Sequence, residues 1–248
     1  MLRTANPALR EKVFKRVEAA ADARQMTIQG TMNKTLLLLF LLLISSVYTW
    51  RLFFARGAEA VYPWLIGGAI GGLIVALVTI FKKTWSPITA PLYAVLEGLF
   101  LGGLSSIMEF QFPGIVLQAV GLTFGVLLVL LFLYKSRIIN VTAKFRTGVI
   151  AATGAIFLVY LVTLVLRLFG VGYISFIHGS GTVGILFSLF VVVIASLNLV
   201  LDFDFIEKGS QQGLPGYMEW YASFGLMVTL IWLYIEILRL LAKLRSRD

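Results

Sequence analysis

The strongest constraint on this chain is a series of seven apolar runs, each about long enough to cross a membrane. A transmembrane helix needs roughly 20 mainly apolar residues to span a hydrocarbon core about 30 Å thick. The runs are continuous and rich in leucine, whereas the strands of a membrane barrel alternate at every second residue. We therefore predict an all-α polytopic membrane protein with seven transmembrane helices. The predicted spans are Thr35 to Phe54, Val61 to Phe81, Pro87 to Phe110, Ile115 to Tyr134, Val149 to Phe169, Thr182 to Leu201 and Met218 to Leu241.

The composition supports this reading. Of the 248 residues, 59% are hydrophobic and 13% are charged, whereas a soluble domain carries about 25% charged residues. The chain contains no cysteine, which excludes disulfide frameworks, thiolate metal sites and cysteine nucleophiles.

Residues 1–33 are predicted to be a cytoplasmic, amphipathic and basic N-terminal segment, and residues 34–248 the membrane domain. Asn6 and Pro7 are typical of a helix start, and the segment would lie on the membrane surface as an interfacial helix. A disordered basic tail is the alternative. The basic residues that cluster here are Arg10, Lys12, Lys15 and Arg16.

Orientation follows from the distribution of Lys and Arg among the loops. With the N-terminus in the cytoplasm, most of the 21 Lys and Arg residues fall on the cytoplasmic side, as expected for a protein of the cell membrane. The basic residues Arg245 and Arg247 argue the other way, because a last helix that entered and returned would place them inside and leave six full spans.

The net charge of +9 lies in short clusters beside apolar runs, which is typical of contact with anionic lipid and not with nucleic acid.

Acidic residues within apolar runs are candidates for function. An acid at the centre of a membrane helix costs roughly 2.5–3.5 kcal/mol on insertion scales, so each one that is retained calls for a functional hypothesis. Glu109 and Glu219 lie near the ends of runs and are interpreted as interfacial. The acids that remain are Glu97, Asp202, Asp204 and Glu236.

The third run combines an acid with a glycine pair. Gly98 and Gly102 are one helical turn apart, a spacing that lets a neighbouring helix approach closely. Glu97 beside them is expected to point toward other helices. The alternative is that the glycines serve packing alone while Glu97 is protonated and hydrogen-bonded.

The sixth run ends in the densest polar group. Asp202 and Asp204 are separated by about 200° around a helix, so at most one of them faces a common partner. Asn198 precedes Asp202 by four residues and extends a polar stripe on the same face.

The seventh run carries Glu236 among apolar residues, with Arg239 three residues later. Arg239 could neutralise Glu236 locally, or it could snorkel toward the helix end. If Glu236 instead meets Asp202 in a low-dielectric bundle, the two carboxyls share a proton and titrate as a coupled pair. Deprotonated, such a pair could bind a hard cation such as Ca²⁺.

Four stretches carry a resemblance to a known family: Phe81 to Pro87, Leu96 to Gly102, Leu197 to Glu207 and Tyr217 to Leu240. With them the chain resembles the transmembrane Bax inhibitor motif family, and most closely its bacterial Bax-inhibitor-like branch. The resemblance implies a last helix surrounded by the first six, and an acid pair that gates a pH-sensitive calcium leak.

By their place in the motif, Asp202 resembles the first acid of that pair and Glu236 the second. The studied bacterial member has two aspartates and also a glutamate in its second span, whereas the run from Val61 to Phe81 has no acid. The sequence leaves open whether Glu97, one helix later, takes that place. The polar residues expected to support the pair are Asn198, Asp204, Glu97 and Arg239.

Two functions remain compatible with these residues. One is a proton-regulated leak for Ca²⁺ or another cation, and the other is a non-conducting regulator that binds other membrane proteins. Neither requires a cofactor. We do not expect an enzyme, because an intramembrane aspartyl protease needs a Gly-x-Gly-Asp motif that the chain lacks, and the single histidine, His178, falls in a glycine-rich loop.

Overall fold

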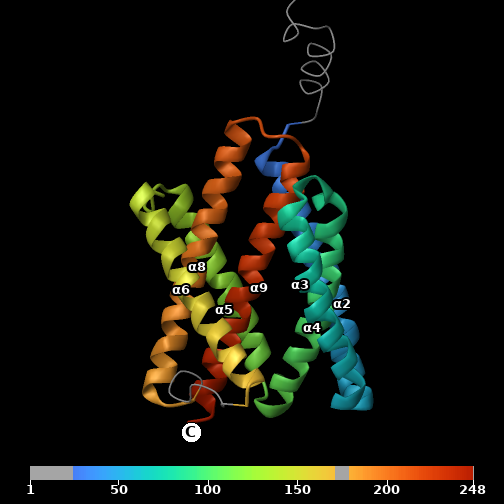
Figure 1. The fold of residues 1–248 in the computed structure, drawn as a ribbon. Coiled ribbons are helices and arrows are strands. Elements are labelled where there is room, and N and C mark those ends of the chain that lie inside the picture. The colour runs from blue at the N-terminus through green and yellow to red at the C-terminus, as the bar shows by residue number, and fades with distance from the viewer. Residues whose placement is uncertain (1–24, 171–178, 248) are drawn as a thin grey trace, which may run out of the picture.

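The computed structural model describes residues 25–170 and 179–247. Within these residues, seven helices are long and apolar enough to cross a membrane, and they stand side by side as a bundle (Figure 1). The predicted all-α fold with seven spans is thereby confirmed. The elements are α2 (Ile28–Arg56), α3 (Ala58–Phe81), the short 3-10 helix η2 (Lys83–Trp85), α4 (Ser86–Gln111), α5 (Ile115–Lys135), α6 (Ala143–Leu168), α8 (Thr182–Gln211) and α9 (Tyr217–Arg245). The predicted interfacial helix before residue 25 and His178 lie outside the described residues.

Several helices extend beyond the apolar runs because polar residues cap or pair within them. Helix α2 begins at Ile28, before the predicted Thr35, since the Thr27 side chain accepts a hydrogen bond from the Gly30 amide at 2.9 Å. Such an N-cap satisfies one of the free amides at a helix start. Helix α8 continues ten residues past Leu201 to Gln211, which places all the acids of this segment on one helix.

Helix α9 is the centre of the bundle. In its most apolar stretch 61% of the residues are buried, a larger share than in any other described span. It packs against α2, α4, α5 and α8, whereas α3 packs mainly on α4, and α6 on α8. The last helix is therefore central, as expected, but four helices supply most of its contacts in place of all six.

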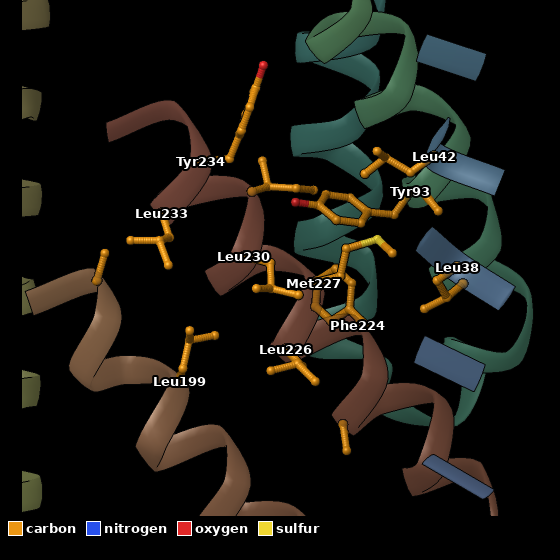
Figure 2. Packing of buried hydrophobic residues seen from close by; sticks show 14 of the residues in the cluster. Leu38, Leu42, Tyr93, Leu199, Phe224, Leu226, Met227, Leu230, Leu233 and Tyr234 are labelled. Atoms are coloured by element: carbon orange, nitrogen blue, oxygen red, sulfur yellow. The ribbon is translucent and has the colours of Figure 1, made fainter. Parts of the chain in front are cut away.

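The core around α9 is built from aliphatic and aromatic side chains. Figure 2 shows Met227 and Leu230 of α9 facing Tyr93 of α4, with Leu38 of α2 beyond and Leu199 of α8 on the other side. In a bilayer such packing is held by van der Waals contact, because lipid tails are as apolar as these side chains. The core therefore fixes the rotation and register of α9 by shape.

The close approach expected at Gly98 and Gly102 occurs between α4 and α2. A Cβ atom at Gly98 would overlap the carbonyl oxygen of Leu42, and one at Gly102 would overlap that of Ser46. Both glycines thus let two helix backbones touch, which is the geometry that small residues permit in membrane bundles.

The two ends of the described chain lie at opposite ends of the bundle (Figure 1). The Met26 amide donates to the Leu214 carbonyl at 2.6 Å, so the start of α2 is joined to the turn between α8 and α9. At the other end Arg245 Nη1 donates to the Pro113 carbonyl at 2.6 Å, in the turn between α4 and α5. Because α9 is continuous from Tyr217 to Arg245, the alternative in which the last helix enters and returns is wrong.

Candidate functional site

A crevice of about 830 Å³ lies between the α3–α4 pair and the α8–α9 pair. Figure 1 shows α9 between α8 on one side and α3 and α4 on the other. The walls are mostly apolar, and two acids, Glu97 of α4 and Asp202 of α8, line it. We call this space the acidic crevice. Its aromatic lining residues are Tyr93, Phe100, Phe205, Tyr221, Phe224 and Trp232.

Asp202 has an incompletely satisfied carboxyl group. Its Oδ2 atom is buried and has no hydrogen-bond partner among the described residues. On the facing helix α9, the Thr229 side chain lies next to the Asp202 carboxyl. A buried carboxylate oxygen without a partner is costly, so this group is available to a proton or a bound cation.

Glu97 reaches the same crevice from α4. The Tyr93 side chain, one turn earlier on α4, lies next to its carboxylate. On the facing helix α3, a Cβ atom at Gly72 would lie 2.6 Å from Glu97 Oε1. The carboxylate of Glu97 therefore rests over the bare backbone of Gly72, on a different side of α4 from the face that packs on α2.

Asn198 and Asp204, the other polar residues of α8 that the sequence singled out, face α6. Asn198 Nδ2 donates to Thr153 Oγ1 at 2.8 Å, so it joins α8 to α6 and does not extend into the crevice. Asp204 is ion-paired with Arg146 at 2.6 Å and with Lys208 at 2.8 Å. As the 200° separation predicts, Asp202 and Asp204 have different partners.

One further ion pair lies at the end of α8, outside the crevice. Glu207 accepts hydrogen bonds from Tyr134 and from Arg137, which lies in the α5–α6 loop. The hydrogen bond and charge of Glu207 raise the pKa of Arg137 above its usual range. The ion pair ties the loop to α8.

Glu236 has its own partners. Its carboxyl is buried, accepts from the Tyr160 hydroxyl at 2.9 Å and pairs with Arg239 Nη1 at 3.0 Å. The Arg239 guanidinium also lies 5.2 Å from the centre of the Tyr160 ring, in a cation–π contact. Local neutralisation by Arg239, the alternative that the sequence left open, is the arrangement found.

The structure does not bring the carboxyls of Asp202 and Glu236 together. Thr229, the neighbour of Asp202 on α9, precedes Glu236 by seven residues, which corresponds to about 10 Å along a helix axis. The antiparallel register agrees, because Lys243 of α9 donates to the Gly184 carbonyl near the start of α8 at 3.0 Å. A proton shared between Asp202 and Glu236 is therefore absent from this arrangement, and the acid that shares a cavity with Asp202 is Glu97.

Glu219 lies in the first turn of α9, near the end of its run as the sequence indicates, but it has specific partners within the protein. This residue is fully buried, and its carboxylate accepts hydrogen bonds from the Thr27 amide at 2.9 Å and the Thr27 hydroxyl at 2.8 Å, with Lys34 as its ion-pair partner. Glu219 joins the first turn of α9 to the first turns of α2. The sequence contained one indication of this contact, an acid in the first turn of a helix. It did not indicate which residues the acid would contact.

Lys243 is a residue that the sequence analysis did not name. It is buried at the far end of α9, where Nζ donates to Ser188 Oγ at 2.8 Å. The signal was its spacing, because Lys243 follows Arg239 by one turn and Glu236 by two, on one side of the helix.

Among the described residues, no group of three His, Cys, Asp or Glu side chains is arranged to hold a metal ion. The proposed Ca²⁺ ligands Asp202 and Glu236 lie apart, as set out above. Two carboxylates on one crevice can attract a cation, but a stable Ca²⁺ site takes six to eight oxygen ligands.

Comparison with known proteins gives one result. The family model described as Bax inhibitor 1 like matches residues 6–246, nearly the whole chain. No curated protein and no solved structure matches the chain. The family match agrees with the resemblance carried by the four motif stretches and with the seven-span bundle. The chain therefore belongs to the Bax inhibitor 1 like family.

Proposed function

We propose that this membrane protein is a proton-regulated cation leak, with Ca²⁺ as the permeant ion, and that Asp202 and Glu97 form its cation site. The observation that carries the proposal is the buried Oδ2 of Asp202, which has no hydrogen-bond partner among the described residues and belongs to a residue that lines the acidic crevice. Glu97 lines the same crevice from the opposite pair of helices.

The chemistry follows from the low polarity of the walls. A carboxylate in apolar surroundings must be neutralised, and either a proton or a cation can do this. Carboxylate oxygens are the ligands that Ca²⁺ prefers. Protons and Ca²⁺ therefore compete for Asp202 and Glu97, and conduction through the crevice is expected to fall as the pH falls.

Glu236 has a separate role in this proposal. Its carboxyl binds Arg239 of its own helix and Tyr160 of α6, so it ties α6 to the central helix beyond the crevice. Replacing Glu236 is expected to change how easily the bundle opens. The dependence of the Ca²⁺ flux on pH is expected to remain, because it is set by Asp202 and Glu97.

The test is Ca²⁺ entry into proteoliposomes loaded with a calcium indicator, measured at acidic, neutral and alkaline pH. Asp202→Asn and Glu97→Gln are expected to lower the flux and flatten its pH response. Glu59→Gln is the matched control, because Glu59 is an exposed acid in the first turn of α3, away from the crevice.

Two results would contradict the proposal. If the unaltered protein gives no flux above empty liposomes, the non-conducting regulator that binds other membrane proteins becomes the better account, and capture of a specific membrane partner would support it. If Glu236→Gln removes the pH response while Asp202→Asn and Glu97→Gln leave it intact, the cation site does not lie in the crevice.

A further inference from the structure

The acidic crevice is open on the side of the bundle. Leu73 of α3 is 60% exposed, Phe205 of α8 is 40% exposed and Val228 is 37% exposed although it belongs to the central helix α9. All three residues line the crevice. Because they lie within helices long and apolar enough to cross a membrane, this side opening can be reached from the lipid.

The size and lining of this space fit an organic ligand. Its volume of about 830 Å³ falls within the range of small-molecule sites, about 300–1,000 Å³. Aromatic rings from three helices surround it, including Tyr93, Phe100, Phe205 and Trp232. Rings of this kind bind ammonium groups through cation–π contact.

The charge of the crevice selects between two kinds of occupant. At one end Lys83 lies 5.3 Å from the centre of the Tyr221 ring, a position that could hold the phosphate of an ordinary phospholipid. The hydrocarbon chain of such a lipid would leave the buried Asp202 Oδ2 without a partner. A lipophilic cation would satisfy both the apolar walls and this carboxylate, so charge complementarity favours the cation.

We propose that the acidic crevice binds a lipophilic ammonium ion that enters sideways from the membrane. The charged nitrogen lies at Asp202 and Glu97, and the hydrocarbon chain lies against Phe205 and Val228. The inference rests on the proposed function only in assigning these two acids to a cation, and it does not require that the protein conducts ions.

The experiment uses the quenching of Trp232, which lines the crevice. The full-length chain, with its other four tryptophans changed to phenylalanine, is placed in nanodiscs of phosphatidylcholine. It is titrated with a bromine-labelled dodecyltrimethylammonium, and in parallel with the brominated alcohol and carboxylic acid of the same chain length. Saturable quenching by the ammonium compound alone is the expected result.

Three variants locate the binding site. Asp202→Asn and Glu97→Gln remove the charges, and the affinity is expected to fall about tenfold or more for each. Gly225→Leu fills the crevice and keeps both acids, since a Cβ atom at Gly225 meets nothing within 4 Å. Saturable quenching should disappear in this variant. The matched control is Gly148→Leu on α6, which is also in open space and should leave quenching unchanged.

Competition provides a second measurement on the chain with all five tryptophans. Unlabelled dodecyltrimethylammonium should displace its radiolabelled form from nanodiscs that hold the unaltered protein, and not from those that hold Gly225→Leu. Equal quenching by the ammonium, alcohol and acid probes would overturn the inference and identify the crevice as a site for lipid chains. Unsaturable quenching, or no effect of Gly225→Leu, would also overturn it.

Ca²⁺ flux, measured on the same purified proteins reconstituted in proteoliposomes, separates this inference from the proposed function. Saturable ammonium binding without flux would support the inference and contradict the leak. Flux without ammonium binding would support the leak and overturn the inference.

Discussion

Glu236 and Arg239, three residues apart on α9, form an ion pair with 3.0 Å between Oε1 and Nη1. Tyr160 of α6 donates to the same carboxylate oxygen at 2.9 Å. Glu236, which has apolar neighbours on both sides in the sequence, is therefore neutralised by a residue of its own helix. Asp202, in contrast, has no ion-pair partner within residues 25–170 and 179–247 and lines a crevice with Glu97, and the functional proposals therefore rest on these two acids.

The ion pair itself predicts an asymmetry between single and double substitutions. Arg239→Gln leaves the buried Glu236 carboxylate without its counter-charge. The free energy of unfolding is expected to fall by up to about 3 kcal/mol. The loss is smaller if solvent already screens Arg239, whose side chain is 38% exposed. The double variant Glu236→Gln/Arg239→Gln removes both charges and should recover most of this loss. Thermal unfolding in detergent, followed by circular dichroism, measures both. Equal melting temperatures for the single and double variants would show that the pair has no such role.

The contact between α2 and α4 predicts a strong effect at one glycine. Gly98→Leu forces a side chain into the Leu42 carbonyl of α2, and overpacking of this kind costs about 1–3 kcal/mol or more. Gly121→Leu on α5 introduces the same side chain where nothing lies within 4 Å. The melting temperature of the first variant should fall well below that of the second. Similar values for both would indicate that α2 and α4 can separate freely.

The buried Glu219 predicts that α2 and α9 are joined at one end. A Cβ atom at Gly30 would lie 2.6 Å from Glu219 Oε2 and nearer still to Oε1, so Gly30→Ala displaces the carboxylate from Thr27 and Lys34. Loss of these buried hydrogen bonds is expected to cost about 1–3 kcal/mol, read as a lower melting temperature. Gly148→Ala, in open space on α6, should be neutral or slightly stabilising, since alanine favours helix. No difference between the two variants would argue against this role of Glu219.

The proposed competition between protons and Ca²⁺ predicts how the Ca²⁺ flux would depend on pH and on Ca²⁺ concentration. As the pH falls, more Asp202 and Glu97 carboxyls carry a proton, so the Ca²⁺ concentration that gives half-maximal flux should rise. In Asp202→Asn this concentration should vary less with pH, because one of the two competing groups no longer titrates. Flux measured over a range of Ca²⁺ concentrations at several pH values provides the test. A half-maximal concentration independent of pH in the unaltered protein would contradict the competition.

The sequence by itself determined the fold class, the seven spans and the acids whose presence in a membrane requires an explanation, because these depend only on the length and polarity of continuous segments. It also placed Asp202 and Asp204 on different sides of a helix, since their spacing fixes the angle between them. The choice of partners was decided by the tertiary structure: Asp202 lies level with Thr229, Glu97 shares its crevice, and Glu219 is buried against Thr27 and Lys34. These pairings depend on the register and rotation of one helix against another, which core packing sets and which the periodicity of a single helix does not encode.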